Sequence, residues 1–138
     1  MQALCAVLLT GMSLAGLACE DLDILDAWVR EPPPNAGVAA AFMTFRNRGL
    51  APLQITQMAS ASFASAAMHE TVTSGDHVHM ASRKVVPIAA GEKVKFEPGG
   101  LHVMLMQPNR PLIAGMTVPL EVTCETGTRR FDLVIKRD

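Results

Sequence analysis

Histidine and methionine side chains gather in one stretch of the sequence, and together they suit a soft metal ion. All four histidines lie between residues 69 and 102, and three of them are adjacent to a methionine or two residues from one. Segment 101–106 reads Leu-His-Val-Met-Leu-Met. On a β-strand its apolar residues would face the core, and His102, Met104 and Met106 would share the other face, about 6.5–7 Å apart in turn. Imidazole and thioether donors favour Cu(I) over Zn(II) and over hard cations.

The same residues also have a simpler interpretation. The sequence contains nine methionines, and the flexible thioether commonly fills gaps in a hydrophobic core. A single histidine on a strand is most often a surface or structural residue. Taken alone, the His102, Met104 and Met106 triplet therefore does not establish a metal site.

Four of these residues follow a longer pattern. Ten residues separate His69 from Met80, twenty-one separate Met80 from His102, and one separates His102 from Met104, which gives H-x10-M-x21-H-x-M. In this spacing the sequence resembles the PCu(A)C-type periplasmic copper chaperones, over most of residues 22–136. The resemblance implies a cupredoxin-like β-sandwich that binds Cu(I) near its surface with these four side chains. It also implies delivery of copper to another protein, either a cytochrome c oxidase subunit with its CuA centre or another copper chaperone.

Other segments carry or depart from this resemblance. Residues 26–30, 68–70 and 98–106 resemble the family's opening strand, first-ligand segment and signature loop and strand. Some family members have a tail rich in His and Met, whereas this sequence ends Val-Ile-Lys-Arg-Asp, so we expect no tail site. His77 and His79 fall outside the family pattern. A solvated turn is the favoured interpretation for them, and an auxiliary Cu(II) site beside Met80 is the alternative.

The elements that must position these residues are short β-strands. After Cys19 the sequence alternates between period-2 runs and turn residues, without a helical stripe, and its 138 residues suggest one domain over residues 19–138. We therefore predict an all-β fold, a cupredoxin-like or Greek-key antiparallel β-sandwich of nine or ten strands. Residues 59–67, rich in small side chains, are expected to form a loop or one helical turn. The expected runs cover residues 22–30, 38–45, 53–58, 67–73, 77–81, 85–88, 93–97, 101–106, 118–123 and 130–136.

The N-terminal segment predicts export. Residues 1–18 contain no charged side chain and end in small residues, as a secretory signal peptide cleaved before Cys19 would. An uncleaved membrane anchor is the alternative. Because Cys5 lies within the signal, Cys19 and Cys124 remain as an even pair, and we expect a disulfide between them. Lipidation of Cys19 is the rival, although Gly16 replaces the usual large aliphatic residue. We expect a periplasmic protein that contacts the membrane only through a lipidated Cys19 or an uncleaved signal.

Composition and motifs exclude several functions. The net charge is −1 and no run of like charges occurs, so nucleic acid is not an expected partner. No Gly-x-Ser-x-Gly and no phosphate-binding glycine-rich loop is present, and we do not expect an enzyme. A blue-copper electron carrier would need a cysteine thiolate ligand, whereas Cys124 is better explained by a disulfide. A copper scavenging or storage protein without a dedicated acceptor, and an interaction β-sandwich without metal, remain alternatives.

Overall fold

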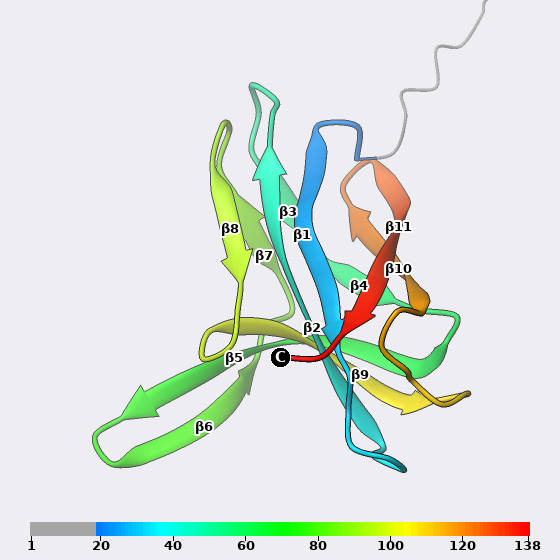
Figure 1. Cartoon of the computed structure of the whole chain (residues 1–138). Coiled ribbons are helices and arrows are strands. Elements are labelled where there is room, and N and C mark those ends of the chain that lie inside the picture. The colour runs from blue at the N-terminus through cyan, green and yellow to red at the C-terminus, as the bar shows by residue number, and fades with distance from the viewer. Residues whose placement is uncertain (1–18) are drawn as a thin grey trace, which may run out of the picture.

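The computed structural model describes residues 19–138, and every regular element in that range is a β-strand (Figure 1). The predicted signal peptide, residues 1–18, lies outside the described residues. No helix that could cross a membrane occurs between residues 19 and 138. The predicted all-β class is confirmed, with one or two more strands than expected. The strands are β1 (Leu22–Arg30), β2 (Val38–Asn47), β3 (Leu53–Ile55), β4 (Gln57–Ala59), β5 (Phe63–Ser74), β6 (His77–Ser82), β7 (Val86–Ile88), β8 (Lys93–Phe96), β9 (Leu101–Pro108), β10 (Thr117–Cys124) and β11 (Gly127–Lys136).

Nine strands form one mixed sheet in the order β4-β10-β11-β1-β2-β8-β9-β5-β6, and β3 and β7 form a separate pair. Most neighbours are antiparallel, but β1 runs parallel to β11, and β8 runs parallel to β9. Strand β2 is shared between two partners: residues 38–41 pair with β9, and residues 43–46 pair with β8. Strand β9 therefore diverges from β8. Strands β5 and β6, which follow β9 in the sheet order, project from the rest of the sheet as a two-stranded arm (Figure 1).

The core follows the alternation of side chains along the strands. On β9, Val103 and Leu105 are at most 1% exposed, as the sequence predicted, and Leu101 packs against the same core. Phe45 on β2 meets Phe96 on β8 edge to face, with ring centroids 5.4 Å apart. This core fixes the orientation of β9, so the residues that alternate with these three, His102, Met104 and Met106, must point to the opposite face.

Two local predictions were wrong. Residues 53–58 were expected to form one strand, but the chain divides at Thr56 into β3 and β4, which pair with β7 and β10. At the break, the Thr56 N–H donates to the Thr123 carbonyl at 3.0 Å. Residues 59–67 were expected to form a loop or a helical turn, but only residues 60–62 form a turn, and β5 begins at Phe63, which is buried and pairs with β9. Pairing with β9 therefore overrides the weak local preference of these small residues.

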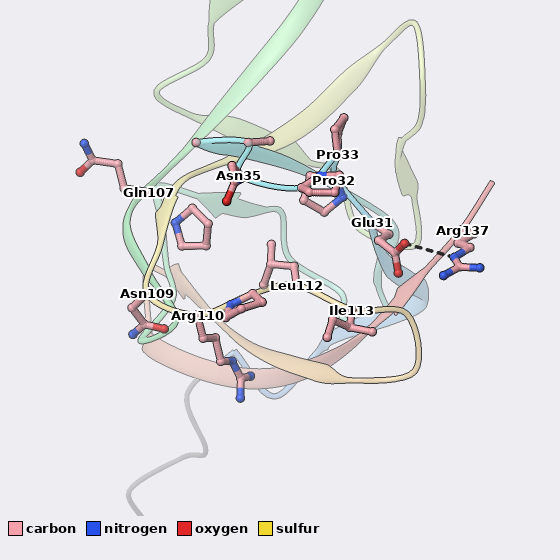
Figure 2. A pocket seen from close by; sticks show the side chains of 15 residues that line it. Glu31, Pro32, Pro33, Asn35, Gln107, Asn109, Arg110, Leu112, Ile113 and Arg137 are labelled. Carbon is pink, nitrogen blue, oxygen red and sulfur yellow. Dashed lines mark hydrogen bonds and ion pairs between the residues drawn. The ribbon is translucent and has the colours of Figure 1, made fainter.

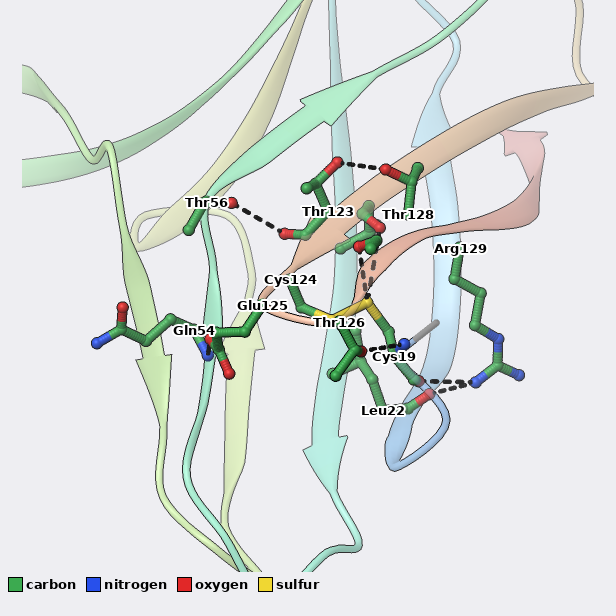
Figure 3. Close-up of a disulfide and its surroundings, with 12 residues drawn as sticks. Cys19, Leu22, Gln54, Thr56, Thr123, Cys124, Glu125, Thr126, Thr128 and Arg129 are labelled. Atoms are coloured by element: carbon green, nitrogen blue, oxygen red, sulfur yellow. Dashed lines mark hydrogen bonds between the residues drawn. A yellow bond between two sulfur atoms is a disulfide. The ribbon is translucent and has the colours of Figure 1, made fainter. Parts of the chain in front are cut away.

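The predicted disulfide is present between Cys19 and Cys124, whose Cα atoms lie 6.0 Å apart (Figure 3). The Cys19 N–H donates to the Thr126 hydroxyl at 2.8 Å, and the Arg129 guanidinium donates to the Leu22 carbonyl at 2.7 Å. Because the cysteines are 105 residues apart, the link removes much chain entropy from the unfolded state, about 4.7 kcal/mol in the chain-entropy model. The bond also occupies the Cys19 thiol that lipidation would need.

Candidate metal centre

The four predicted ligands lie on three neighbouring strands. His69 is on β5, Met80 is on β6, and His102 and Met104 are on β9. In the β5–β9 ladder His69 is directly opposite His102, so both imidazoles lie on one face. In the β5–β6 ladder Met80 is opposite Thr71, which shares that face with His69 because the two are two residues apart. The strand register therefore gathers all four side chains on one face of the sheet.

The two imidazole rings leave nitrogen atoms free beside each other. Their centroids are 6.0 Å apart. His102 is 4% exposed, and its Nδ1 lies 3.1 Å from the Gly100 carbonyl oxygen. A carbonyl can only accept, so Nδ1 carries the proton and Nε2 presents a lone pair. Among residues 19–138, His102 Nε2 and His69 Nδ1 are the only buried side-chain nitrogen or oxygen atoms without a hydrogen-bond partner. A metal ion would satisfy such atoms, whose burial otherwise costs about 1–3 kcal/mol each.

The Met80 and Met104 thioethers are both accessible from the same face of the sheet. Met104 is half-buried, and the residues opposite it on the flanking strands are Ala40 and Ala67, which are too small to cover the sulfur. Met80 is 58% exposed on the edge strand β6. Met80, Met104 and His102 line a common hollow of about 330 Å³. His69 does not line this hollow, but its ring lies beside the ring of His102, which does.

The donors in this hollow are uncharged. Its two charged lining residues are Arg30 and Glu31, and both are paired. Arg30 Nε donates to the Asp138 carboxylate at 2.8 Å, and Glu31 accepts from Arg137 at 3.1 Å. The hydrogen bond from the Ala114 backbone N–H, together with the Arg137 guanidinium, holds the pKa of Glu31 below its usual value. A neutral set of two imidazoles and two thioethers suits a singly charged soft cation.

The four candidate donors include no carboxylate and no thiolate. Within residues 19–138, no three His, Cys, Asp or Glu side chains come together as a metal site. Glu70, one of the acidic residues nearest in sequence, accepts from Arg83 Nε at 2.6 Å and lies on the strand face opposite His69. Glu70 is therefore not placed to orient the His69 ring.

A larger hollow of about 720 Å³ lies on the other side of the Glu31–Pro33 segment (Figure 2). Its wall is rich in proline and includes the ion pair of Glu31 with Arg137. None of the residues that line it is a histidine, methionine or cysteine. This hollow therefore offers no donors for a soft metal, whereas the smaller one is lined by an imidazole and two thioethers.

Fold and donor face together define the class: a cupredoxin-like β-sandwich with imidazole and thioether donors on one face of its sheet. The family model described as "Putative lipoprotein LpqE-like" matches residues 22–131. The chain belongs to this family, which is the PCu(A)C family, and the family membership predicted from the ligand spacing is confirmed.

Several known proteins are similar to this chain. The "Putative lipoprotein Lxx21020" of Leifsonia xyli subsp. xyli is 29% identical over 114 residues, which cover 82% of this chain and 68% of that protein. The solution structure of CuI-DR1885 from Deinococcus radiodurans has a TM-score of 0.69 and 26% identity, covering 93% of this chain and 86% of that one. The copper-bound PCuAC domain from PmoF2 has a TM-score of 0.73 and 21% identity, covering 86% and 94%. The likeness to the two solved structures confirms the cupredoxin-like fold.

Proposed function

We propose that this protein is an exported copper chaperone that holds one Cu(I) ion with His69, Met80, His102 and Met104 and passes it on by ligand exchange. The observation that carries the proposal is the pair of buried imidazole nitrogens without hydrogen-bond partners, His69 Nδ1 and His102 Nε2, on the same sheet face as two thioethers. The ion is cargo rather than a resident cofactor, and the protein needs no catalytic group.

The donor chemistry supports Cu(I) as the cargo. Thioether sulfur is soft and uncharged, so it selects Cu(I) over Zn(II) and over hard cations. Two similar structures are described as copper-bound or CuI forms. A thioether is also not consumed by disulfide formation, which matters in a chain whose Cys19 and Cys124 are already oxidised to a disulfide. The disulfide itself supports an oxidising compartment, and we place the mature domain in the periplasm after cleavage of residues 1–18.

The exposure of Met80 supports transfer by ligand exchange. The sulfur-bearing side chain is 58% exposed on an edge strand, whereas His102 is 4% exposed. An approaching acceptor can therefore replace Met80 first, while the buried imidazole still holds the ion. The CuA centre of cytochrome c oxidase is the acceptor that the family resemblance implies. A scavenging or storage protein would have the same binding site and lack transfer to this acceptor.

A leucine at position 104 tests the ligand set. Met104→Leu keeps the approximate volume and removes the sulfur, so the fold should persist. Cu(I) affinity, measured by competition with a chromophoric Cu(I) chelator, should fall about tenfold or more, or about 1.4 kcal/mol. Met106→Leu is the matched control, because Met106 lies on the same face of β9 but does not line the hollow. Equal affinities for Met104→Leu and the parent would contradict the proposed site.

Transfer separates a chaperone from a scavenger. The Cu(I)-loaded protein is mixed with the apo CuA domain of cytochrome c oxidase, the two proteins are separated at successive times, and the copper bound to each is measured. A chaperone should metallate that domain faster than an equal amount of Cu(I) held by the chelator. Tight Cu(I) binding without transfer would favour the scavenging function, and the absence of Cu(I) binding would favour the interaction domain.

A further inference from the structure

Strand β6 carries two histidines that the proposed Cu(I) site does not use. His77 and His79 are both exposed. The solvated turn expected from the sequence was wrong for them, because the turn consists of residues 75–76 and His77 begins the strand. His77 pairs with Ser74, and His79 pairs with Val72. Both histidines therefore have the regular geometry of a β-strand.

The strand places these two imidazoles on the face away from the Cu(I) site. His77 and His79 are two residues apart and share a face, whereas Val78 and Met80 take the other one. Because Met80 faces the same way as His69 and His102 through its pairing with Thr71, the two sets of donors point to opposite sides of the β5–β6 arm. The two sets can therefore hold separate ions.

The imidazole pair is suited to chelation. Residues two apart on a strand are about 6.5–7 Å apart, so two rings that lean together can each form a bond of about 2.0–2.1 Å to one ion. Within residues 19–138, neither ring takes part in a hydrogen bond or an ion pair. The nearest carboxylate along that face of β5 is that of Glu70, and it is bound by Arg83.

We propose that His77 and His79 form a second metal site that binds Cu(II), with water in the remaining positions. Neutral imidazoles without sulfur do not select Cu(I), and among divalent ions of the first transition row Cu(II) binds such nitrogen donors most tightly. No third His, Cys, Asp or Glu from the described range joins the pair, so the ion exchanges readily with solvent. This site does not depend on the proposed Cu(I) function.

The test blocks the soft site first. The disulfide-bonded protein is saturated with Ag(I), a diamagnetic soft cation that thioethers bind, and is then titrated with Cu(II) alone in a buffer without thiols. Calorimetry should show one Cu(II) per chain. Electron paramagnetic resonance should show coupling to two imidazole nitrogens. The double variant His77→Ala/His79→Ala should weaken Cu(II) binding by about tenfold or more, whereas Val78→Ala, on the same strand and the other face, should leave it unchanged.

Two results would overturn the second site: Cu(II) binding by the double variant with the parent's affinity and spectrum, or no Cu(II) binding by the Ag(I)-loaded parent. Displacement of Cu(II) by an equal concentration of Zn(II) would overturn the assignment to copper. Because both histidines are exposed, the double variant should fold. Its Ag(I) and Cu(I) binding checks this directly, and it separates a failure of this site from a failure of the four-ligand site.

Discussion

Replacing His102 with leucine should remove the metal site without destabilising the apo protein. His102 Nε2 is buried without a partner, and such an atom costs about 1–3 kcal/mol. The substitution also removes the hydrogen bond from Nδ1 to the Gly100 carbonyl, worth about 0.5–1.5 kcal/mol. That carbonyl still accepts from the Thr71 N–H at 3.1 Å, so it is not left unsatisfied. The free energy of unfolding of apo His102→Leu should therefore change by between about −0.5 and +2.5 kcal/mol.

Copper should make the parent protein more stable than the His102→Leu variant. A ligand that binds only the folded state stabilises it by about 2.7 kcal/mol when its free concentration is a hundred times Kd. In urea unfolding experiments at that concentration of chelator-buffered Cu(I), the parent protein should gain this stability. The His102→Leu variant, without one of its imidazole ligands, should gain much less and become the less stable of the two.

A large loss of stability in the apo variant would refute this reasoning. If apo His102→Leu unfolded with a free energy lower by more than about 2 kcal/mol, its imidazole would be contributing to the fold through contacts other than the Gly100 hydrogen bond. Met106→Leu provides the control on the same strand. It should change the free energy of unfolding by less than about 1.5 kcal/mol and should keep the stabilisation by copper.

Two further predictions concern the scaffold. Cys124→Ser leaves Cys19 unpaired and should lower the free energy of unfolding by about 4–5 kcal/mol; denaturant unfolding measures this, and a loss below about 1 kcal/mol would contradict the assigned role of the disulfide. Glu31→Gln should destabilise the protein at neutral pH, because the Ala114 N–H and the Arg137 guanidinium lower the pKa of the carboxyl from 4.5. A lowered pKa contributes stability above the unfolded-state value and loses it as the pH falls through the folded-state value, so the parent and variant should converge in acid. A difference that widened below pH 4.5 would contradict this.

The strands and the face of the sheet that bears the ligands could be predicted from local pattern. Alternation along residues 101–106 placed Val103 and Leu105 in the core and His102 and Met104 on the other face, and the structure agrees. The division at Thr56 could not be predicted in this way. It depends on pairing with strands β7 and β10, which lie far away in the sequence. The parallel pairing of β1 with β11 likewise joins distant segments, about which local alternation carries no information.

Within the candidate site, spacing identified the residues but not their environments. The pattern H-x10-M-x21-H-x-M selected residues that the β5–β9 and β5–β6 registers bring to one face. The burial of His102 and the exposure of Met80 depend on which strands flank each residue, and that follows only from the sheet order. Alternation along the expected strand 77–81 places His77 and His79 on one face and Met80 on the other, but only the pairing of β6 with β5 shows which of these faces lies on the side of His69.

Because β6 is an edge strand, the rate of copper release can vary independently of the thermal stability of the domain. Within the described sheet, β6 pairs with β5 alone, and all but one of its residues are exposed. Local opening of such a hairpin requires far less free energy than global unfolding. In the proposed site, only Met80 leaves with β6, while the other three ligands stay on β5 and β9. Substitutions in β6 can therefore change the dissociation rate of the ion by orders of magnitude and leave the melting temperature of the protein nearly unchanged.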